Sequence, residues 1–166
     1  MQRVAILGPG GAGKSTLADE LGARTGLPVI HLDRYFWRPN WVETPRDEWR
    51  ARQEELFAAD AWIADGNYSA TADVRLRRAD TVLLLDIPIW RTIPRALRRS
   101  IGNHGRSVQA EGCPERVDPA FLWWIATYRR RSRPKVFALV KAHAPDAKFL
   151  VLRSPGAVRR FLASVP

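Results

Sequence analysis

The chain reads Gly8-Pro9-Gly10-Gly11-Ala12-Gly13-Lys14-Ser15 close to its first residue, and Thr16 follows. This stretch satisfies every position of the Gly-x-x-x-x-Gly-Lys-Ser/Thr phosphate loop. Glycines let the backbone curl closely around a polyphosphate, so that consecutive N–H groups and a helix N-terminus point at negative charge. We therefore assign nucleotide binding to residues 8–16. Lys14 is expected to reach the β and γ phosphates of ATP, and the Ser15 hydroxyl to take a position at Mg²⁺.

The residues on either side of the loop supply the context that this motif requires. Val4 to Leu7 form a short apolar run typical of a buried parallel strand. After the loop, Leu17, Ala18 and Leu21 recur at helical spacing until Gly26 ends the helix. The alternative, a glycine-rich turn that fits the pattern by chance, does not explain a strand before it and a helix after it.

Length and composition limit the class of protein. A chain of 166 residues with 46% hydrophobic content is expected to form a single domain, residues 1–166, with a sizeable core. Its one cysteine, Cys113, excludes an internal disulfide and suits a reducing cytoplasm. A first strand that begins by Val4 leaves no room for a signal peptide, and no apolar run approaches the roughly 20 residues of a membrane span. We expect a cytoplasmic protein.

The net charge is +10, carried mostly by arginine. Arginine holds phosphates through two parallel hydrogen bonds, which suits phosphoryl transfer, whereas a pI near 10.9 also suits nucleic acid. A compositional bias toward Arg and Ala, with many solvated side chains, explains at least part of the same charge. Charge alone therefore does not choose among these readings.

Acidic residues follow three further apolar runs. Asp33 follows residues 27–32, Asp65 ends the run that begins at Trp62, and Asp86 lies in the run from Thr81 to Pro88. Ligands of open α/β sheets bind beyond the carboxyl ends of the strands, so these carboxylates are candidate site residues.

For each of the three carboxylates the sequence allows two interpretations, a functional role and a structural one. Asp33 is a candidate to orient or deprotonate an acceptor hydroxyl, and its alternative role is a turn or helix cap. Asp65 is a candidate ligand of Mg²⁺ through water, and its alternative role is a simple Asp-Gly turn. Asp86 is as well explained by a structural role before Pro88 as by contact with metal or nucleotide. His31, inside its strand, is interpreted as a packing residue rather than a ligand.

The segment from Tyr35 to Glu43 is aromatic and interrupted by Pro39 and Asn40, which argues against a regular helix. Its aromatic rings either wall a pocket for a flat acceptor group or form a flap that seals the core. Elsewhere strands and helices alternate along the chain, ending with a strand at residues 148–152. This alternation predicts an α/β fold, a parallel sheet between two helical layers. No guanine-reading Asn/Thr-Lys-x-Asp motif occurs, which disfavours a GTPase.

Two arginine clusters flank a segment rich in turn residues, at about residues 100–120, with the composition of a mobile lid. A lid that closes over a transferred phosphoryl group must neutralise charge and exclude water. The alternatives are exposed helix arginines and, for residues 129–135, contact with a nucleic-acid backbone. The candidate catalytic arginines are Arg95, Arg99, Arg131 and Arg133, with Arg98 and Arg130 as reserves.

Taken together, these motifs resemble the bacterial topology modulation protein (FlaR-like) family, which is related to adenylate kinases and other P-loop kinases. The likeness covers nearly the whole chain. Besides the phosphate loop, it depends on His31-Leu32-Asp33, Phe36-Trp37, Trp41-Val42-Glu43-Thr44-Pro45, Trp62-Ile63-Ala64-Asp65-Gly66-Asn67-Tyr68, Gly112-Cys113-Pro114-Glu115 and Arg131-Ser132-Arg133-Pro134.

The resemblance implies a three-layer α/β/α P-loop fold with a five-stranded parallel sheet in the order 2-3-1-4-5, ATP at the phosphate loop and a lid between the arginine clusters. Asp65-Gly66 would occupy the place where adenylate kinases have Asp-Gly-Phe-Pro-Arg. Here Asn67-Tyr68-Ser69 stands for Phe-Pro-Arg, so an arginine that contacts an acceptor nucleotide is missing.

Two functions follow as hypotheses. The first is an ATP- and Mg²⁺-dependent small-molecule or nucleotide kinase, with Lys14, Asp33 and the lid arginines as catalytic residues and Ser15 and Asp65 at the metal. The second is an ATP-dependent regulatory protein that affects DNA topology by binding DNA or another protein.

Overall fold

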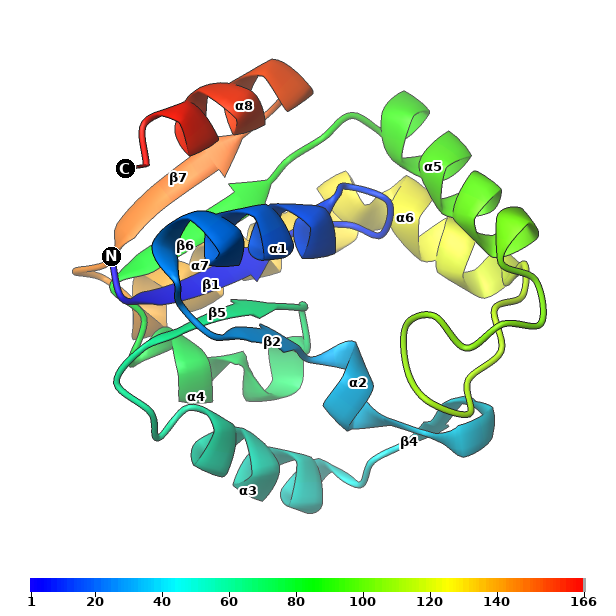
Figure 1. Ribbon diagram of the computed structural model, residues 1–166, viewed down its shortest axis with the longest axis horizontal. Helices are drawn as coiled ribbons and strands as arrows, with labels where there is room; N and C mark the ends of the chain where they lie inside the picture. The colour runs from blue at the N-terminus through cyan, green and yellow to red at the C-terminus, as the bar shows by residue number, and fades with distance from the viewer. Residues whose placement is uncertain (166) are drawn as a thin grey trace.

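The computed structural model describes residues 1–165, which form a parallel five-stranded sheet between two layers of helices (Figure 1). The order across the sheet is β2-β5-β1-β6-β7, and every neighbouring pair is parallel. Numbered by their sequence among these five, the strands follow the order 2-3-1-4-5, as predicted. The strands are β1 (Arg3–Leu7), β2 (Val29–His31), β5 (Trp62–Asp65), β6 (Thr81–Leu85) and β7 (Lys148–Leu152).

Side chains alternate across the sheet and build two separate cores, as the period of two along a strand requires. On β1, Val4 and Ile6 belong to one core and Ala5 and Leu7 to the other. The first core lies under α1 (Lys14–Thr25) and α8 (Pro155–Ala163). The second lies under α3 (Arg46–Leu56), α4 (Ala72–Leu76) and α7 (Arg133–His143). The predicted three-layer arrangement is therefore confirmed.

Among the remaining elements, α2, β4, α5 and α6 lie at the end of the sheet where the phosphate loop lies, on the right of Figure 1. A short antiparallel pair, β3 and β4, carries the aromatic segment, and its two strands are joined by η1. The bounds are α2 (Asp33–Phe36), β3 (Trp37–Arg38), η1 (Pro39–Trp41), β4 (Val42–Glu43), η2 (Ser69–Thr71), α5 (Ile89–Gly102) and α6 (Pro119–Arg131). Residues 103–118 connect α5 to α6.

The structure differs from the sequence-based expectation mainly in the second helical layer. The predicted strands are present: β5 coincides with its run, and β2 and β6 are shorter than the apolar runs that indicated them. The helix that begins at Pro119 ends at Arg131, and a second helix starts at Arg133, so the second arginine cluster spans a break at Ser132. None of the helices within residues 1–165 has the length and apolar character needed to cross a membrane.

Candidate functional site

The phosphate loop leaves β1 through a glycine that no other residue replaces easily. Gly8 has φ +147°, and a Cβ added there would lie 2.7 Å from the carbonyl oxygen of Leu85. Farther along, a Cβ at Gly10 would lie 2.4 Å from Cζ of Phe121 on α6. The loop then enters α1 through Gly13, whose left-handed backbone caps the helix. Close packing on β6 and α6 therefore determines the course of the loop.

Lys14 is the first residue of α1, and its side chain turns back over the loop. Its Nζ donates to the carbonyl oxygen of Pro9 at 3.1 Å. Burial lowers the pKa of the Lys14 ammonium, the carboxylates of Asp65 and Asp33 oppose this shift, and Arg99 adds to it. These residues come from four separate elements or their ends. Of the other predicted catalytic residues, Asp33 and Arg99 therefore influence the charge of Lys14.

A chain of polar contacts begins at Ser15 and crosses the ends of two strands. The Ser15 hydroxyl donates to Oδ2 of Asp65 at 2.7 Å. The other carboxylate oxygen, Oδ1, lies 2.6 Å from Nδ1 of His31, which faces Asp65 directly in the β2–β5 register. Nε2 of His31 lies 3.0 Å from Oδ1 of Asp19 on α1. His31, which the sequence presented as a packing residue, thus holds Asp65 in place.

The pKa shifts of Asp65 and His31 each favour the charged form of the side chain. Burial alone would raise the pKa of the Asp65 carboxyl, but hydrogen bonds from His31 and Ser15 and the charge of Lys14 bring it below its usual value. The hydrogen bond with Asp65 raises the pKa of His31, against the opposing effect of burial. Asp65 is therefore a carboxylate over the physiological range.

Ser15 and Asp65 suit the Mg²⁺ that a phosphate loop implies. Their oxygens are adjacent, and hard oxygen donors are the ligands that Mg²⁺ prefers. Within residues 1–165 there is no group of three or more His, Cys, Asp or Glu side chains arranged to hold a metal. One or two protein oxygens, completed by phosphate oxygens and water, match how Mg²⁺ binds beside nucleotides.

The turn that follows β5 contacts both the phosphate loop and Asp33. The carboxamide of Asn67 accepts from the Gly8 N–H at 3.1 Å and donates to the Gly8 carbonyl at 2.8 Å. The next residue, Tyr68, donates its hydroxyl to Oδ1 of Asp33. Burial, together with the charge and the hydrogen bond of Asp33, raises the pKa of Tyr68, so this hydroxyl remains a donor.

Asp33 is the first residue of α2 and lies beyond the carboxyl end of β2; the cap position of this helix is Leu32, not Asp33. Its assignment to the acceptor hydroxyl stays a prediction. Nearby, Phe36 packs against Trp49 and Tyr68, with ring centroids 5.2 and 4.5 Å away. Phe36 therefore seals the core beneath the hairpin, as the flap interpretation expects, while Trp37 and Trp41 pair above it.

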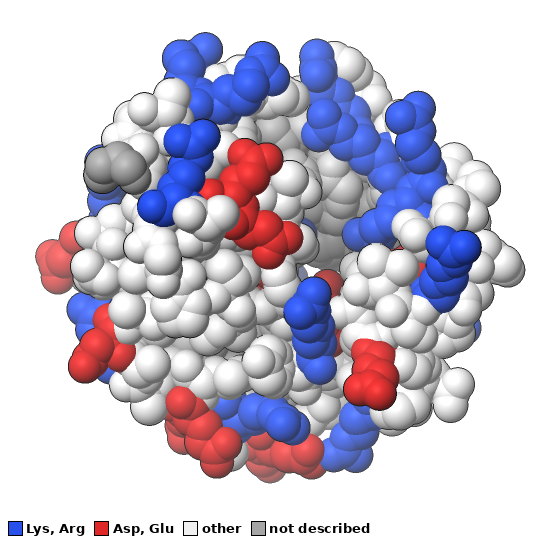
Figure 2. Space-filling view, viewed as in Figure 1, with Lys and Arg blue, Asp and Glu red and all other residues white. Residues whose placement is uncertain are grey.

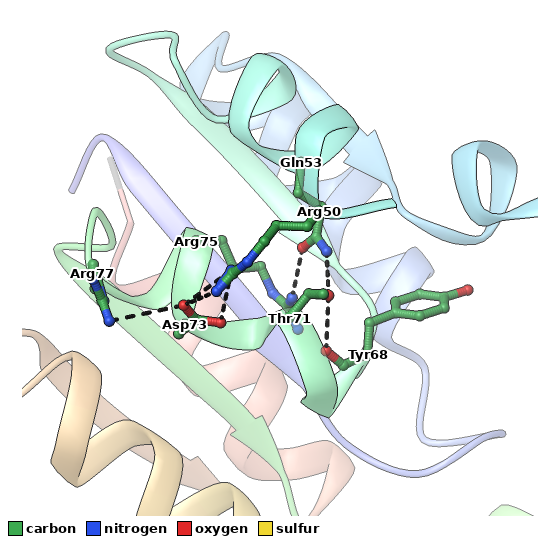
Figure 3. Close-up of polar contacts among 7 residues, drawn as sticks. All are labelled: Arg50, Gln53, Tyr68, Thr71, Asp73, Arg75 and Arg77. Atoms are coloured by element: carbon green, nitrogen blue, oxygen red, sulfur yellow. Dashed lines mark hydrogen bonds and ion pairs between the residues drawn. The ribbon is translucent and has the colours of Figure 1, made fainter. Parts of the chain in front are cut away.

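A buried arginine supports this turn from behind, and the sequence did not indicate it. Arg75 of α4 is 0% exposed, and burial lowers its pKa to about 10. It donates to Oε1 of Gln53 at 3.1 Å (Figure 3). It also donates to the carbonyl of Gly66 at 3.0 Å and to the carbonyl of Asn67. Arg75 adjoins Arg77 and Arg78 in the sequence, and nothing in that basic run distinguishes the one side chain that is buried.

The predicted lid arginines have different surroundings. Arg133 lies with Nε 3.2 Å from Oδ2 of Asp86, and Arg99 with Nε 3.6 Å from Oε1 of the buried Glu115. Arg95 and Arg131 are exposed, as are the reserves Arg98 and Arg130. A further arginine that the prediction omitted, Arg129, donates from Nε to Oδ1 of Asp86 at 3.0 Å.

Asp86 is therefore the anchor of the second arginine cluster. It is 3% exposed at the end of β6, and two arginines from different helices share its carboxylate. This outcome corresponds to the structural reading of Asp86. The contribution of the arginines to phosphoryl transfer stays a prediction.

The connection between α5 and α6 rests on the aromatic hairpin. The carbonyl of Gly112 accepts from the Asn40 N–H at 2.8 Å, and the carbonyl of Pro114 accepts from the Trp41 indole at 2.8 Å. Sγ of Cys113 donates to the carbonyl of Arg38 at 3.2 Å. The predicted lid segment thus contacts the segment that follows Asp33.

Basic side chains crowd one part of the face shown in Figure 2, at the upper right over α5, beside a hollow in the surface. The α5 arginines are Arg91, Arg95, Arg98 and Arg99. The hollow separates them from the side of the molecule that carries α1. This surface is open to a solvent or ligand anion.

No family model matches this chain, and no curated protein sequence does. Solved structures do match over nearly its whole length. A shikimate kinase from Acinetobacter baumannii in complex with shikimate has a TM-score of 0.66 at 16% identity, covering 99% of this chain and 90% of that one. The chain shares its fold with this kinase.

Two further structures agree. A sugar kinase from Janibacter sp. HTCC2649 has a TM-score of 0.57 at 22% identity and covers 98% of this chain and 93% of its own. A shikimate kinase from Bacteroides thetaiotaomicron has a TM-score of 0.58 at 15% identity, and the match covers 98% of this chain and 94% of that one. Identities this low establish the shared fold alone. The finer resemblance to the topology modulation family stays a prediction.

Proposed function

We propose that this protein is an ATP- and Mg²⁺-dependent phosphotransferase that transfers the γ-phosphoryl group to a hydroxyl or phosphate of a small-molecule acceptor. The observation that carries the proposal is the 2.7 Å hydrogen bond between Ser15 and Asp65 beside a complete phosphate loop. It brings together the two side-chain oxygens, of Ser15 and Asp65, that would be the protein ligands at a magnesium–nucleotide site. The fold shared with small-molecule kinases supports it.

In this proposal the loop N–H groups and Lys14 bind the β and γ phosphates, and Ser15 and Asp65 hold Mg²⁺. The metal would neutralise negative charge on the phosphates. Asp33 orients or deprotonates the acceptor hydroxyl, and the Tyr68 hydroxyl fixes the direction of its carboxylate.

The arginines complete the proposed site by stabilising charge on the transferred group. Arg99 has the strongest support: burial is the main cause that lowers the pKa of Lys14, and Arg99 is the one lid arginine whose charge adds to this shift. Arg133 is held by Asp86, and its use at the site requires that ion pair to loosen. Catalysis of this kind comes mainly from positioning and electrostatics.

The test is a screen of nucleosides, nucleotides and small hydroxyl compounds for stimulation of ADP formation from ATP and Mg²⁺. Lys14→Ala serves as the control, because it removes one charged contact to phosphate. Such a hydrogen bond contributes about 1.5–3 kcal/mol, so ATP affinity is expected to fall about 10- to 100-fold. Calorimetry that detects no adenine nucleotide binding to folded wild-type protein would refute the proposal.

The second candidate, an ATP-dependent regulator that affects DNA topology through DNA or protein binding, draws on the exposed arginines of α5, including Arg95 and Arg98. Binding to duplex DNA would weaken steeply with salt, because neutralising phosphates releases counterions. Salt-dependent DNA binding without acceptor-stimulated ADP formation would favour this candidate. Acceptor-stimulated ADP formation without DNA binding would favour the kinase.

A further inference from the structure

The Asn67 side chain lies just beyond the end of the β1–β5 pairing, where the main-chain groups of Gly8 are no longer paired with a neighbouring strand. Pairing between β1 and β5 ends at Ile6 and Asp65, and the Gly66 N–H still donates to the Ile6 carbonyl at 3.2 Å. Beyond this point β1 turns into the phosphate loop, with Gly8 at φ +147°. Within residues 1–165, the N–H and carbonyl of Gly8 make no hydrogen bond to another main-chain group.

The carboxamide of Asn67 replaces the missing peptide group. It accepts from the Gly8 N–H at 3.1 Å and donates to the Gly8 carbonyl at 2.8 Å. A carboxamide carries a donor and an acceptor side by side, as a peptide group does, so it can pair with both main-chain atoms of one residue. Asp and Ser cannot satisfy both at once without a protonation or a longer reach.

The turn that presents Asn67 is itself fixed. Arg75, fully buried, donates to the carbonyls of Gly66 and Asn67. Tyr68 has φ +37°, a left-handed conformation that a bulky residue adopts only where its surroundings impose it. The Thr71 N–H donates to the Tyr68 carbonyl at 3.1 Å and closes the turn. Two independent anchors therefore hold Asn67 rigidly against the loop.

We infer that Asn67 is a positioning residue for nucleotide binding. Its carboxamide fixes the orientation of the Gly8 N–H and carbonyl, and so the direction of the loop N–H groups that follow, before phosphate binds. Preorganised donors bind an anion more tightly, because their ordering is complete before binding. Arg75 acts one step further back, by holding the backbone of Asn67. This inference rests on the proposed function, since it requires a nucleotide at residues 8–16.

The experiment measures the Kd of the full-length protein for ADP with Mg²⁺ by calorimetry at 25 °C. Asn67→Ala is expected to raise that Kd about tenfold, through the loss of two main-chain hydrogen bonds at the loop. Asn67→Asp has the same shape and keeps the acceptor but not the donor, so its Kd is also expected to rise. Circular dichroism and a melting curve establish that each variant is folded at 25 °C, so that the Kd reports on the site and not on global stability.

Thr25→Val is the matched control. Like Asn67, Thr25 donates to one main-chain carbonyl, that of Leu21 at 2.8 Å, and accepts from one main-chain N–H, that of Leu27 at 3.4 Å. It lies at the far end of α1 from the phosphate loop. Its removal is expected to change the ADP Kd by less than twofold.

Each outcome has a distinct meaning. An unchanged Kd in folded Asn67→Ala overturns the inference, while ADP binding by the wild type leaves the proposed function standing. A Kd raised equally by Thr25→Val also overturns it, because any loss of a main-chain contact would then have the same effect. Unfolding of both Asn67 variants at 25 °C makes the side chain a folding element and counts against a positioning role. Absence of ADP binding by the wild type overturns both proposals.

Discussion

Replacing the buried Arg75 by Met should destabilise the protein strongly, although the side chain binds no ligand. Methionine fills a similar space but leaves the acceptors on Gln53, Gly66 and Asn67 without a donor. An orphaned buried acceptor costs about 1–3 kcal/mol. Relief from desolvating the charge offsets part of that sum, so we expect a net loss of about 3–5 kcal/mol in the free energy of unfolding.

The assay is thermal unfolding at neutral pH, supported by urea titration. For a domain of this size 1 kcal/mol corresponds to a change of about 2–4 °C in Tm, so the expected decrease is about 6–20 °C. The pKa of Arg75, lowered to about 10 by burial, leaves it charged under these conditions.

Arg77→Met is the matched control, two residues further along the same basic run (Figure 3). Its side chain is 67% exposed and its one ion pair, with Asp73, spans 3.9 Å. Exposed pairs contribute about 0–1 kcal/mol, so the control should change Tm by no more than about 4 °C. If Arg75→Met unfolds within that range of the wild type, the reasoning about the turn is wrong.

Two further predictions concern Asp33 and His31. Asp33→Asn keeps an oxygen for the Tyr68 hydroxyl but cannot accept a proton, so kcat should fall roughly 10²- to 10⁴-fold with ATP affinity unchanged; unaltered turnover at saturating acceptor would exclude the assigned role. In magnesium-free protein, NMR titration should give His31 a pKa above 6.5, and Asp65→Asn should remove the shift. Because the folded-state pKa of His31 is raised, its stabilising contribution is fully present below pH 6.5 and is lost as pH rises through the folded-state pKa. Because that of Asp65 is lowered, its contribution is present above pH 3.8 and is lost as pH falls through the folded-state pKa. A His31 pKa at or below 6.5 would contradict the hydrogen bond between His31 and Asp65.

The elements that could be predicted are those whose signals are local. The phosphate loop carries its chemistry in consecutive residues, and the apolar run at residues 148–152 coincides with β7. The acids at strand ends were predictable in kind, because parallel strands deliver their carboxyl ends to one edge of the sheet. Asp65 and Ser15 accordingly lie side by side, 50 residues apart in the sequence.

The supporting contacts were not predictable in the same way. Arg129 and Arg131 share one basic run on α6 and both are exposed, yet Arg129 is the one that pairs with Asp86. A helix aims only part of its surface inward, and which part depends on packing that the run itself does not encode.

The sequence by itself determined that this chain has a phosphate loop between a strand and a helix, and that further strands end in carboxylates. Tertiary structure alone decided that His31 pairs with Asp65, that Asn67 completes the pairing of Gly8, and that Arg75 is buried beneath them. The physical reason is the separation along the chain between the residues that interact. Backbone conformation and hydrophobic periodicity are properties of neighbouring residues, whereas a hydrogen bond between side chains on different elements depends on register and packing across the whole sheet.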